Sequence, residues 1–373
     1  MVAGRGRPIA AAAAAPAVPP HALTGHPITM FLQALATAVP DHVLTQRQCW
    51  EIGRESPAVR RLSRRSRLIL QSVLTGESGI ATRHFALGDL NHVFELGADE
   101  LNAAFRHEAP RLASAALTAA LDRADLSPPQ LDALLVCTCT GYLCPGVSSY
   151  VAERLGLRRD VLLHDLVGLG CGAAIPTLQA ASHLLAAQPD AVVACVAVEI
   201  CSAAFYLDDD DGVLVSASLF SDGAAATLWR SRPGQPGAPR CHGFHSLHLP
   251  EKRDLLRFEL KQGRLRNLLH GTVPEEAARA VAELFSATNG APPAAVLVHP
   301  GGRDVLDAIE AVLPGFSLTA SRTILRDHGN MSSPSVLFVL EEHLRTHPAP
   351  AGDLWMASFG AGFSAHACRF STG

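Results

Sequence analysis

Four short segments of the chain are apolar at nearly every position. They span residues 131–137, 161–166, 191–198 and 294–298. Runs of strand length without polar alternation are typical of strands that are buried on both faces of a sheet. Residues 110–124, 172–185 and 305–313 instead carry apolar side chains at helical spacing. Strands that alternate with helices predict an α/β fold in which helices cover the sheet.

A glycine- and proline-rich connection, SRPGQPGAP, interrupts this pattern at residues 231–239. Such segments favour exposed loops, so we divide the chain into an N-terminal half, residues 28–232, and a C-terminal half, residues 240–373. Each half has an apolar strand that leads into a glycine-containing turn, DLVGLGC in the first and VLVHPGG in the second. This parallel indicates structural duplication. Residues 1–27, rich in Ala and Pro, predict a disordered tail or a start codon placed too far upstream.

Composition narrows the class of protein. With 373 residues, of which 48% are hydrophobic, the chain can bury a large core. A net charge of -4 provides no basic field for nucleic acid and favours small-molecule substrates. The apolar runs are too short to span a membrane. Nine cysteines, an odd number in apolar contexts, predict reduced thiols in a cytoplasmic protein rather than a disulfide framework.

Cys171 is the first candidate for chemistry. It lies in the run GLGCGAAIP, between an apolar strand and a predicted helix. At a helix N-terminus the free backbone N–H groups and the helix dipole favour a thiolate, so we expect a lowered pKa for this thiol. The flanking glycines let a substrate carbonyl approach closely. Taken alone, however, a buried cysteine is more often a small apolar core residue.

Two residues further along the chain strengthen that candidate. His299 ends an apolar strand in HPGG, and Asn330 lies in GNMSSPS. A histidine can exchange a proton with a thiol, and a carboxamide N–H can stabilise an oxyanion. Each also has an ordinary interpretation, as a structural histidine and as a turn residue tolerant of positive φ. Together with Cys171 they predict thioester chemistry and acyl transfer.

Other clusters carry less weight. The four aspartates at 208–211 point in different directions along the chain, so a solvated loop is favoured over a metal site. Cys137, Cys139 and Cys144 lack the spacing and the second ligand pair of a zinc site, so we expect no metal. Five arginines between Arg60 and Arg67 have helical spacing, which suits a solvated face and the phosphates of a coenzyme equally.

Read in order, the motifs resemble those of the type III polyketide synthase family, of which plant chalcone synthase is a member. The earlier motifs are LATAVPDHVLTQ, GIATRHF, EAPRLA and CTCTGYLCPG. The later motifs are GLGCG, SLFSDGAAA, HPGG, GNMSS and FGAGFSA. The resemblance extends from about Ile28 to the C-terminus. HPGG and GNMSS after a Gly-Cys-Gly distinguish this family from its ketoacyl synthase III relatives.

The resemblance implies a thiolase-like fold, with two duplicated α/β halves in αβαβα layers, and a homodimer. It implies that Cys171 carries the acyl group, beside His299 and Asn330. It also implies a gatekeeper between the coenzyme tunnel and the cavity, for which Phe220 aligns closely and Phe258 less securely. The remaining cavity positions that it implies are Cys139, Thr140 and Cys144, the last near the cavity of the dimer partner.

Coenzyme A binding is less clearly assigned. The basic residues that bind its phosphates in the plant enzymes should fall just before Ile80, but an ungapped match places Val73 and Glu77 there. The nearest basic candidates lie one to two helical turns earlier. The coenzyme contacts that we expect are Arg60, Arg64, Arg67, Gly301 and Gly302.

The resemblance predicts decarboxylative condensation of malonyl-CoA onto a starter acyl group on Cys171, repeated and followed by cyclisation, with no metal or redox cofactor. We expect a thiolate at Cys171 that is stabilised by an imidazolium at His299, and an enolate held by His299 and Asn330. Gly168 and Leu169 offer no polar side chain before the nucleophile, and the aromatic content is 5%. An apolar pocket therefore favours a fatty acyl starter and an alkylpyrone or alkylresorcinol product.

Alternatives stay open at this point. A malonyl-primed product of the polyhydroxynaphthalene or phloroglucinol type is nearly as well supported. A ketoacyl synthase III-like enzyme would require an acyl carrier protein. The alternative from another class is a cysteine hydrolase, because papain-like proteases also have Cys, His and Asn in this order, although in a CGSCW-like context. A noncatalytic subunit is disfavoured because all three residues are intact.

Overall fold

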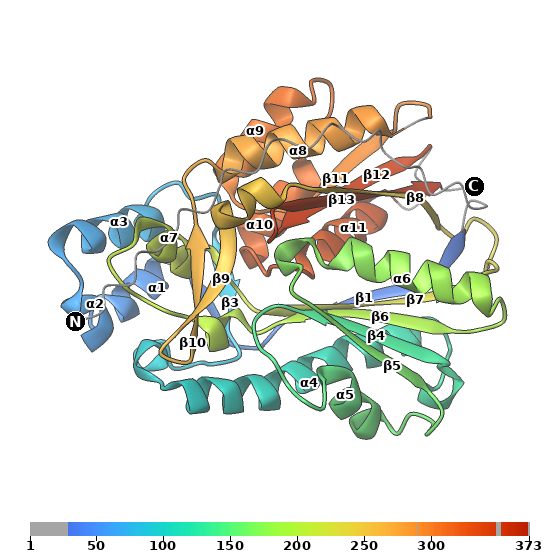
Figure 1. Cartoon of the computed structure of the whole chain (residues 1–373), viewed down its shortest axis with the longest axis horizontal. Coiled ribbons are helices and arrows are strands. Elements are labelled where there is room, and N and C mark those ends of the chain that lie inside the picture. The colour runs from blue at the N-terminus through green and yellow to red at the C-terminus, as the bar shows by residue number, and fades with distance from the viewer. Residues whose placement is uncertain (1–28, 289, 348–351, 372–373) are drawn as a thin grey trace, which may run out of the picture.

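The computed structural model describes residues 29–288, 290–347 and 352–371. The predicted tail at 1–27 lies outside these residues. Within them, nine strands form one mixed sheet (Figure 1). In sheet order the strands are β11 (Ala295–Val298), β12 (Leu354–Gly360), β13 (Ser364–Ser371), β8 (Arg240–His248), β1 (Met30–Ala38), β7 (Gly223–Arg230), β6 (Val193–Glu199), β4 (Ala133–Thr138) and β5 (Leu162–Val167).

The strand pairing repeats. β4 runs parallel to β6, and β6 then β7 then β1 are antiparallel neighbours. β11 runs parallel to β12 in the same way, and β12 then β13 then β8 are antiparallel neighbours. The two sets meet where β1 pairs with β8 over only two positions, Met30 with Cys241 and Phe31 with Arg240. The sheet is thus built from two similar sets of strands.

Helices cover and separate these two sets. α4 (Ala98–Arg123) and α5 (Val147–Leu155) pack on the outer face of the first set. α6 (Ala174–Ala187) and α11 (Ser335–Thr346) lie between the two sets and contact both, whereas α8 (Val273–Ala287) packs on the outer face of the second, with α9 (Arg303–Val312) against it (Figure 1). This is the expected thiolase-like αβαβα layering.

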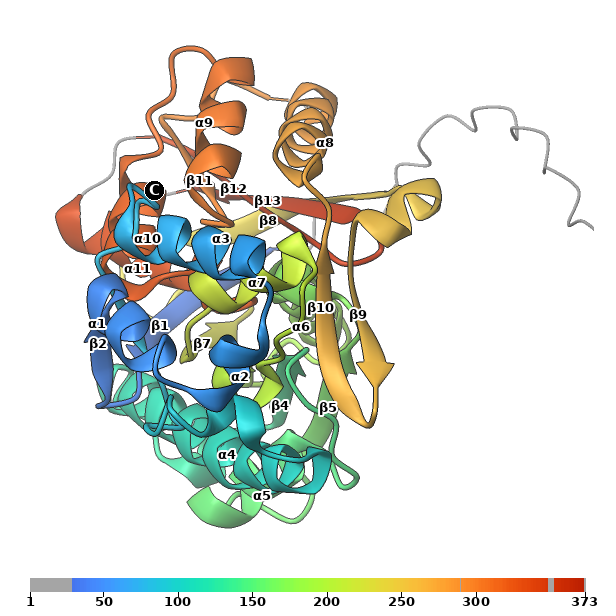
Figure 2. The same ribbon diagram turned by 90° about the vertical axis from the view of Figure 1, so that its left-hand side faces the viewer.

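The remaining elements gather at one end of the layers (Figures 1 and 2). They are β2 (Val43–Thr45), α1 (Gln46–Gly53), α2 (Pro57–Arg61), α3 (Arg64–Thr75), β3 (Thr82–His84), α7 (Asp211–Leu219), β9 (Leu256–Lys261), β10 (Arg264–Leu269) and α10 (Thr319–His328). β9 and β10 form a hairpin whose turn residues, Gln262 and Gly263, both have positive φ, as a two-residue turn of type I′ requires.

Two expectations from the sequence are wrong, one about the burial of β5 and one about the start of α4. β5 is not buried on both faces: it lies at one edge of the sheet, and Leu162 and Val167 are 39% and 52% exposed. The helix expected at 110–124 begins earlier, at Ala98. The Glu100 carboxylate accepts a hydrogen bond from the Gly97 backbone N–H at 2.8 Å and caps the first turn, which accounts for the start at Ala98; the helix contains Pro110 in its interior.

The other predicted strands and helices are confirmed within two residues at each end. No described helix has the length and apolar character needed to cross a membrane.

Candidate active site

Cys171 lies in a single 3-10 turn, Gly170–Gly172, between β5 and α6. This turn packs directly against the end of β12. Gly170 has φ 57°, and a Cβ at Gly360 would lie 2.5 Å from the Gly172 nitrogen and 2.9 Å from the Cys171 nitrogen. The glycines of GLGCG and FGAGFSA therefore let two backbone segments meet, and they fix the position of the thiol.

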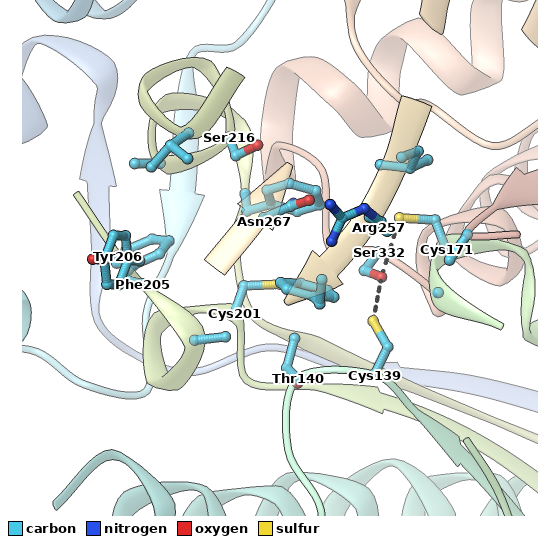
Figure 3. Close-up of a pocket in the computed structure, with 18 residues that line it drawn as sticks. Cys139, Thr140, Cys171, Cys201, Phe205, Tyr206, Ser216, Arg257, Asn267 and Ser332 are labelled. Atoms are coloured by element: carbon cyan, nitrogen blue, oxygen red, sulfur yellow. Dashed lines mark hydrogen bonds between the residues drawn. The ribbon is translucent and has the colours of Figure 1, made fainter. Parts of the chain in front are cut away.

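Ser332 contacts the Cys171 thiol directly. Its hydroxyl donates a hydrogen bond to the Cys171 sulfur at 3.2 Å and lies 3.3 Å from the Cys139 sulfur (Figure 3). Ser332 has φ 61°, a backbone conformation that is costly for a residue with a side chain. The strained serine thus stands between two cysteines of the site.

A fully buried carboxylate, Glu199, organises the wall behind these thiols. Its Oε2 accepts hydrogen bonds from the Cys139 N–H at 2.9 Å and from the Thr140 hydroxyl at 2.8 Å. Its Oε1 accepts one from the Ser333 hydroxyl at 2.5 Å. Glu199 therefore joins the ends of β4 and β6 to the loop that follows α10.

Sequence reasoning missed both Ser332 and Glu199. Glu199 carried a signal that could have revealed it, because it is the one charged residue that closes the apolar run before Ile200. A carboxylate at the end of a buried strand needs partners, and clusters of such partners mark functional sites.

His299 and Asn330 reach the site from neighbouring loops. His299 follows β11, and its ring meets the Phe359 ring edge-to-face at 5.2 Å. The Asn330 Nδ2 donates to the Gly301 carbonyl at 3.1 Å, and its Oδ1 accepts from the Ser332 N–H at 2.8 Å. Asn330 thus connects the histidine loop to the serine that contacts the nucleophile.

Charge in this closed site differs from the expectation. The pKa of the Cys171 thiol is raised to about 12, mainly by burial; the Ser332 hydrogen bond acts in the opposite direction, and the nearby Glu199 carboxylate adds to the increase. Burial also lowers the pKa of His299 to about 3, and its Nδ1 has no hydrogen-bond partner among the described residues. The resting pair is therefore a neutral thiol and a neutral imidazole, because removal from water outweighs the helix N-terminus.

Two cavities meet at the nucleophile. The outer cavity has a volume of about 590 Å³, and Cys171, His299 and Asn330 all line it. The inner cavity is narrow, about 40 Å³. The residues that border both are Cys171, Phe220 and Leu256.

These cavities locate the predicted pocket residues. Phe220 lies at the boundary, where a gatekeeper is expected. Phe258 lines only the inner cavity, so the boundary position that we expected for it is held by Leu256 instead. Cys139 and Thr140 also line the inner cavity, whereas Cys144 is exposed and borders neither of the two.

The predicted coenzyme contacts divide into two groups. Gly301 and Gly302 line the outer cavity. Arg60, Arg64 and Arg67 do not line it, because the wall that α3 provides comes from its C-terminal end, with Ser72 and Val73. Arg60 pairs with Glu55 at 2.5 Å instead. The arginine that does line the outer cavity is Arg303, which donates to the Glu77 carbonyl.

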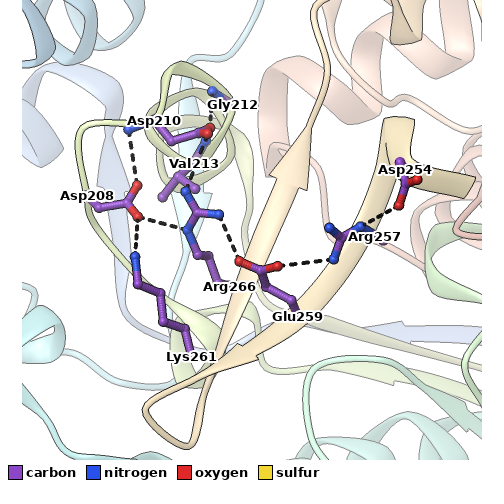
Figure 4. A network of polar contacts seen from close by, with 9 residues as sticks. All are labelled: Asp208, Asp210, Gly212, Val213, Asp254, Arg257, Glu259, Lys261 and Arg266. Atoms are coloured by element: carbon purple, nitrogen blue, oxygen red, sulfur yellow. Dashed lines mark hydrogen bonds and ion pairs between the residues drawn. The ribbon is translucent and has the colours of Figure 1, made fainter. Parts of the chain in front are cut away.

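The aspartate run is exposed at Asp209, Asp210 and Asp211, as expected of a solvated loop, but polar contacts also hold it in place (Figure 4). Asp208 accepts hydrogen bonds from Arg266 at 2.8 Å and from Lys261 at 3.2 Å, and Asp210 caps α7. The run therefore fastens the β9–β10 hairpin to α7. In the described part of the chain, no group of three or more His, Cys, Asp or Glu side chains could hold a metal ion, and all nine cysteines are free.

Comparison with known proteins agrees with this geometry. Residues 45–241 match the FAE1/type III polyketide synthase-like family, and residues 272–362 match the C-terminal domain of chalcone and stilbene synthases. A 1,3,6,8-tetrahydroxynaphthalene synthase of Streptomyces peucetius subsp. caesius is 32% identical, over 89% of this chain and 90% of its own. A 3,5-dihydroxyphenylacetyl-CoA synthase of Streptomyces toyocaensis is 34% identical, over 64% of this chain and 66% of its own.

Solved structures show the same fold. The brown algal PKS-I of Ectocarpus siliculosus superposes with a TM-score of 0.85 at 22% identity, covering 94% of this chain and 100% of its own. The tetrahydroxynaphthalene synthase of Streptomyces coelicolor gives 0.80 at 25% identity, covering 92% and 99%. The matched families together span the nucleophile, histidine and asparagine segments. The chain therefore belongs to the type III polyketide synthases, acyltransferases that condense units from malonyl-CoA.

Proposed function

We propose that this enzyme loads Cys171 from malonyl-CoA and builds a compact polyhydroxylated aromatic product of the polyhydroxynaphthalene or phloroglucinol type. The supporting observation is the inner cavity of about 40 Å³, walled by Phe205, Tyr206 and Phe258. Any chain held on Cys171 must move part of this wall. A fatty acyl starter would add an alkyl tail to the same polyketide, so it requires the largest displacement of these three rings and is the most costly. The alkylpyrone or alkylresorcinol expected from the sequence is therefore the less favoured product.

The names of two relatives are in keeping with this proposal. One relative is named for tetrahydroxynaphthalene and the other for dihydroxyphenylacetyl-CoA. Both compounds are hydroxylated aromatics, and neither carries a long alkyl chain. Their identities of 32% and 34% are high enough to support a similar class of product. The incubation described below identifies the arrangement of rings and hydroxyl groups in the product.

Loading starts from the neutral pair. The Cys171 sulfur attacks the thioester carbonyl of malonyl-CoA, and the thiol proton passes to His299 because a neutral imidazole can accept it. The bond between the carbonyl carbon and the coenzyme sulfur breaks, and His299 returns the proton to the departing coenzyme A. The products are a malonyl thioester on Cys171 and free coenzyme A. Proton transfer at the moment of attack avoids a stable buried thiolate.

Extension uses the same side chains. A second malonyl-CoA loses carbon dioxide, and the electron pair of the broken bond forms an enolate on its thioester. His299 and the second Nδ2 hydrogen of Asn330 can donate to the enolate oxygen, because both side chains line the outer cavity with Cys171. The enolate carbon attacks the Cys171 thioester, and the sulfur leaves. The lengthened chain then returns to Cys171 for the next addition.

One incubation tests this proposal. The purified full-length chain is supplied with ¹³C-labelled malonyl-CoA, with and without octanoyl-CoA or palmitoyl-CoA, in the absence of a carrier protein. We expect a hydroxylated aromatic product labelled at every carbon from malonyl-CoA alone. Product that forms only with a long acyl-CoA would contradict malonyl priming, and a requirement for an acyl carrier protein would indicate a ketoacyl synthase III-like activity. Cys171→Ala is the control and should give no product.

The proposal includes a homodimer in the cytoplasm. The edge strand β5 exposes Leu162 and Val167. An apolar sheet edge is suited to pairing with a second copy. Nine free thiols suit a reducing compartment.

Light scattering tests the dimer. Val167→Glu should shift the full chain from dimer to monomer. The matched control, Leu260→Glu, changes another exposed apolar residue, on β9, and should leave the dimer intact. Equal masses for the two variants would argue against β5 as the interface.

A further inference from the structure

Two polar side chains of the inner cavity have no partner. Ser216 on α7 and Asn267 on β10 are only 4% and 8% exposed, and both line this cavity (Figure 3). The Ser216 hydroxyl and the Asn267 Oδ1 lack a hydrogen-bond partner among the described residues. Buried polar groups are nearly always hydrogen-bonded, and one left unpaired costs stability. Two such groups on one cavity wall need an explanation.

Ser216 is unusual for its helix. Ser218, two positions further along α7, donates to the Leu214 carbonyl at 2.8 Å, which is how a buried helical serine ordinarily satisfies its hydroxyl. Ser216 makes no such bond to its own helix. Its hydroxyl instead faces a cavity whose nearby wall is apolar, with Val213, Phe220 and Phe258.

Asn267 is held in place by its strand and by charged neighbours. It pairs with Phe258 in the β9–β10 hairpin, and the preceding residue, Arg266, is bonded to Asp208 at 2.8 Å and Glu259 at 2.9 Å (Figure 4). A Cβ at Gly212 would lie 2.1 Å from the Leu269 carbonyl oxygen, so α7 and β10 touch through their backbones. The hairpin and the helix therefore present Ser216 and Asn267 in a fixed arrangement.

We propose that Ser216 and Asn267 form a polar subsite for the growing chain, on the opposite side of the inner cavity from the Glu199 network. A hydroxyl and a carboxamide both donate and accept, which fits the carbonyl or enol oxygens of a polyketide. An alkyl tail in the same place would leave both groups unpaired. A site built for hydrogen bonds discriminates strongly against an analogue that lacks them. The subsite thus selects acyl chains that carry oxygen beyond the thioester.

This inference rests on the proposed function, because it takes the inner cavity to hold a polyketide. Its test compares Asn267→Leu and Ser216→Ala with Ser218→Ala as the matched serine control on the same helix. Each variant receives ¹³C-labelled malonyl-CoA alone. Products are separated by length with mass spectrometry, and the acyl group on Cys171 is measured by intact mass.

We expect Asn267→Leu to form the full-length product about tenfold more slowly and to release more short lactones, with Ser216→Ala showing a smaller change in the same direction. The rate of first loading of Cys171 should stay unchanged in both. With octanoyl-CoA as competing starter, Asn267→Leu should incorporate about tenfold more octanoyl per malonyl starter than the unaltered chain. Ser218→Ala should keep the original product distribution.

Thermal unfolding separates a binding role from a structural one. Removal of an unpaired buried group should leave the melting temperature of Ser216→Ala unchanged or raised, whereas Ser218→Ala loses a satisfied hydrogen bond and should melt lower. Unaltered product lengths and starter preference in Asn267→Leu would overturn the subsite while leaving the proposed function intact. A parent enzyme that makes no product from malonyl-CoA would instead refute the proposed function itself.

Discussion

The Ser332 hydroxyl donates its hydrogen bond to the Cys171 sulfur at 3.2 Å, from a backbone with φ 61°. It is the side-chain contact that works against burial and lowers the pKa of the thiol. A conformation that costs stability is thus retained at the residue that favours the reactive form of the nucleophile.

Ser332→Ala should therefore slow the chemistry of Cys171. Loss of the hydrogen bond raises the pKa of the thiol, and one pKa unit reduces the thiolate at a given pH tenfold. We expect alkylation of Cys171 by iodoacetamide to be about tenfold slower between pH 7 and 9. Peptide mass spectrometry across this range measures it. An unchanged pH–rate profile would show that the contact has no effect on the thiol.

Ser332→Gly provides the companion variant. It removes the same hydroxyl, so alkylation of Cys171 should slow by the same factor as in Ser332→Ala. Glycine adopts the left-handed backbone without strain, so the free energy of unfolding of Ser332→Gly should exceed that of Ser332→Ala by about 1 kcal/mol. Chemical denaturation compares the two. Equal stabilities would mean that φ at this position carries no strain.

Acid should destabilise the fold partly through His299. Burial lowers its pKa to about 3, so below pH 6.5 the unfolded chain takes up a proton that the folded chain does not. The stability that neutral His299 contributes is present above pH 6.5 and is lost as pH falls toward 3, at up to about 1.4 kcal/mol per pH unit. His299→Gln should flatten this part of the curve. A slope equal to that of the unaltered chain between pH 6 and 4 would contradict it.

His328 offers a comparison outside the reaction site. Its pKa is lowered to about 4, mainly by burial and then by the neighbouring His84, against the opposing effect of nearby carboxylates. His328→Gln should also flatten the acid limb, but over a narrower range because its folded pKa lies closer to the ordinary value. Urea unfolding at a series of pH values distinguishes the two variants.

Gly360→Ala should disturb the nucleophile turn. The added Cβ would lie within 3 Å of backbone atoms of Leu169, Cys171 and Gly172, none of which can move like a side chain. We expect a loss of about 1–3 kcal/mol in the free energy of unfolding and little acyl loading of Cys171. Gly53→Ala is the control, since nothing lies within 4 Å of a Cβ there. If the Gly360 variant loaded Cys171 at the original rate, the turn would not depend on this contact.

Arg303 is expected to bind the phosphates of coenzyme A, because it is the arginine that lines the outer cavity. Arg303→Gln should raise KM for malonyl-CoA about tenfold and leave kcat nearly unchanged. Malonyl-N-acetylcysteamine, which lacks the phosphates, should be used equally well by both enzymes. Arg60→Gln is the matched control. A KM effect in Arg60→Gln but not in Arg303→Gln would reinstate the assignment made from the sequence.

The layers of the fold could be predicted because the core strands are continuous apolar runs. β4, β6 and β11 are buried in the structure as expected, and their helices follow at the right spacing. β5 has the same apolar character but is exposed, whereas β11, at the other edge of the sheet, is covered by α10 and α11. The sequence of a strand does not state what will pack on it, so the exposure of β5 could not be derived.

The site was only partly predictable. Cys171, His299 and Asn330 do line one cavity, as their order along the chain suggested. The charge state of the pair could not be derived, because it depends on burial and on Glu199, which approaches from another strand. Asn267 and Ser216 were missed since an unpaired polar group is recognised only when its surroundings are known.

Cys171 borders both cavities, so in the proposed reaction its sulfur lies between the coenzyme on the outer side and the growing chain on the inner side. In each cycle of the proposed reaction, malonyl-CoA enters the outer cavity and the chain in the inner cavity becomes two carbons longer. The size of the inner cavity, which coenzyme A does not occupy in this proposal, would then limit the length of the product. Mutations in the inner wall can then change what is made without altering how malonyl-CoA is recognised, which leaves the two properties free to evolve separately.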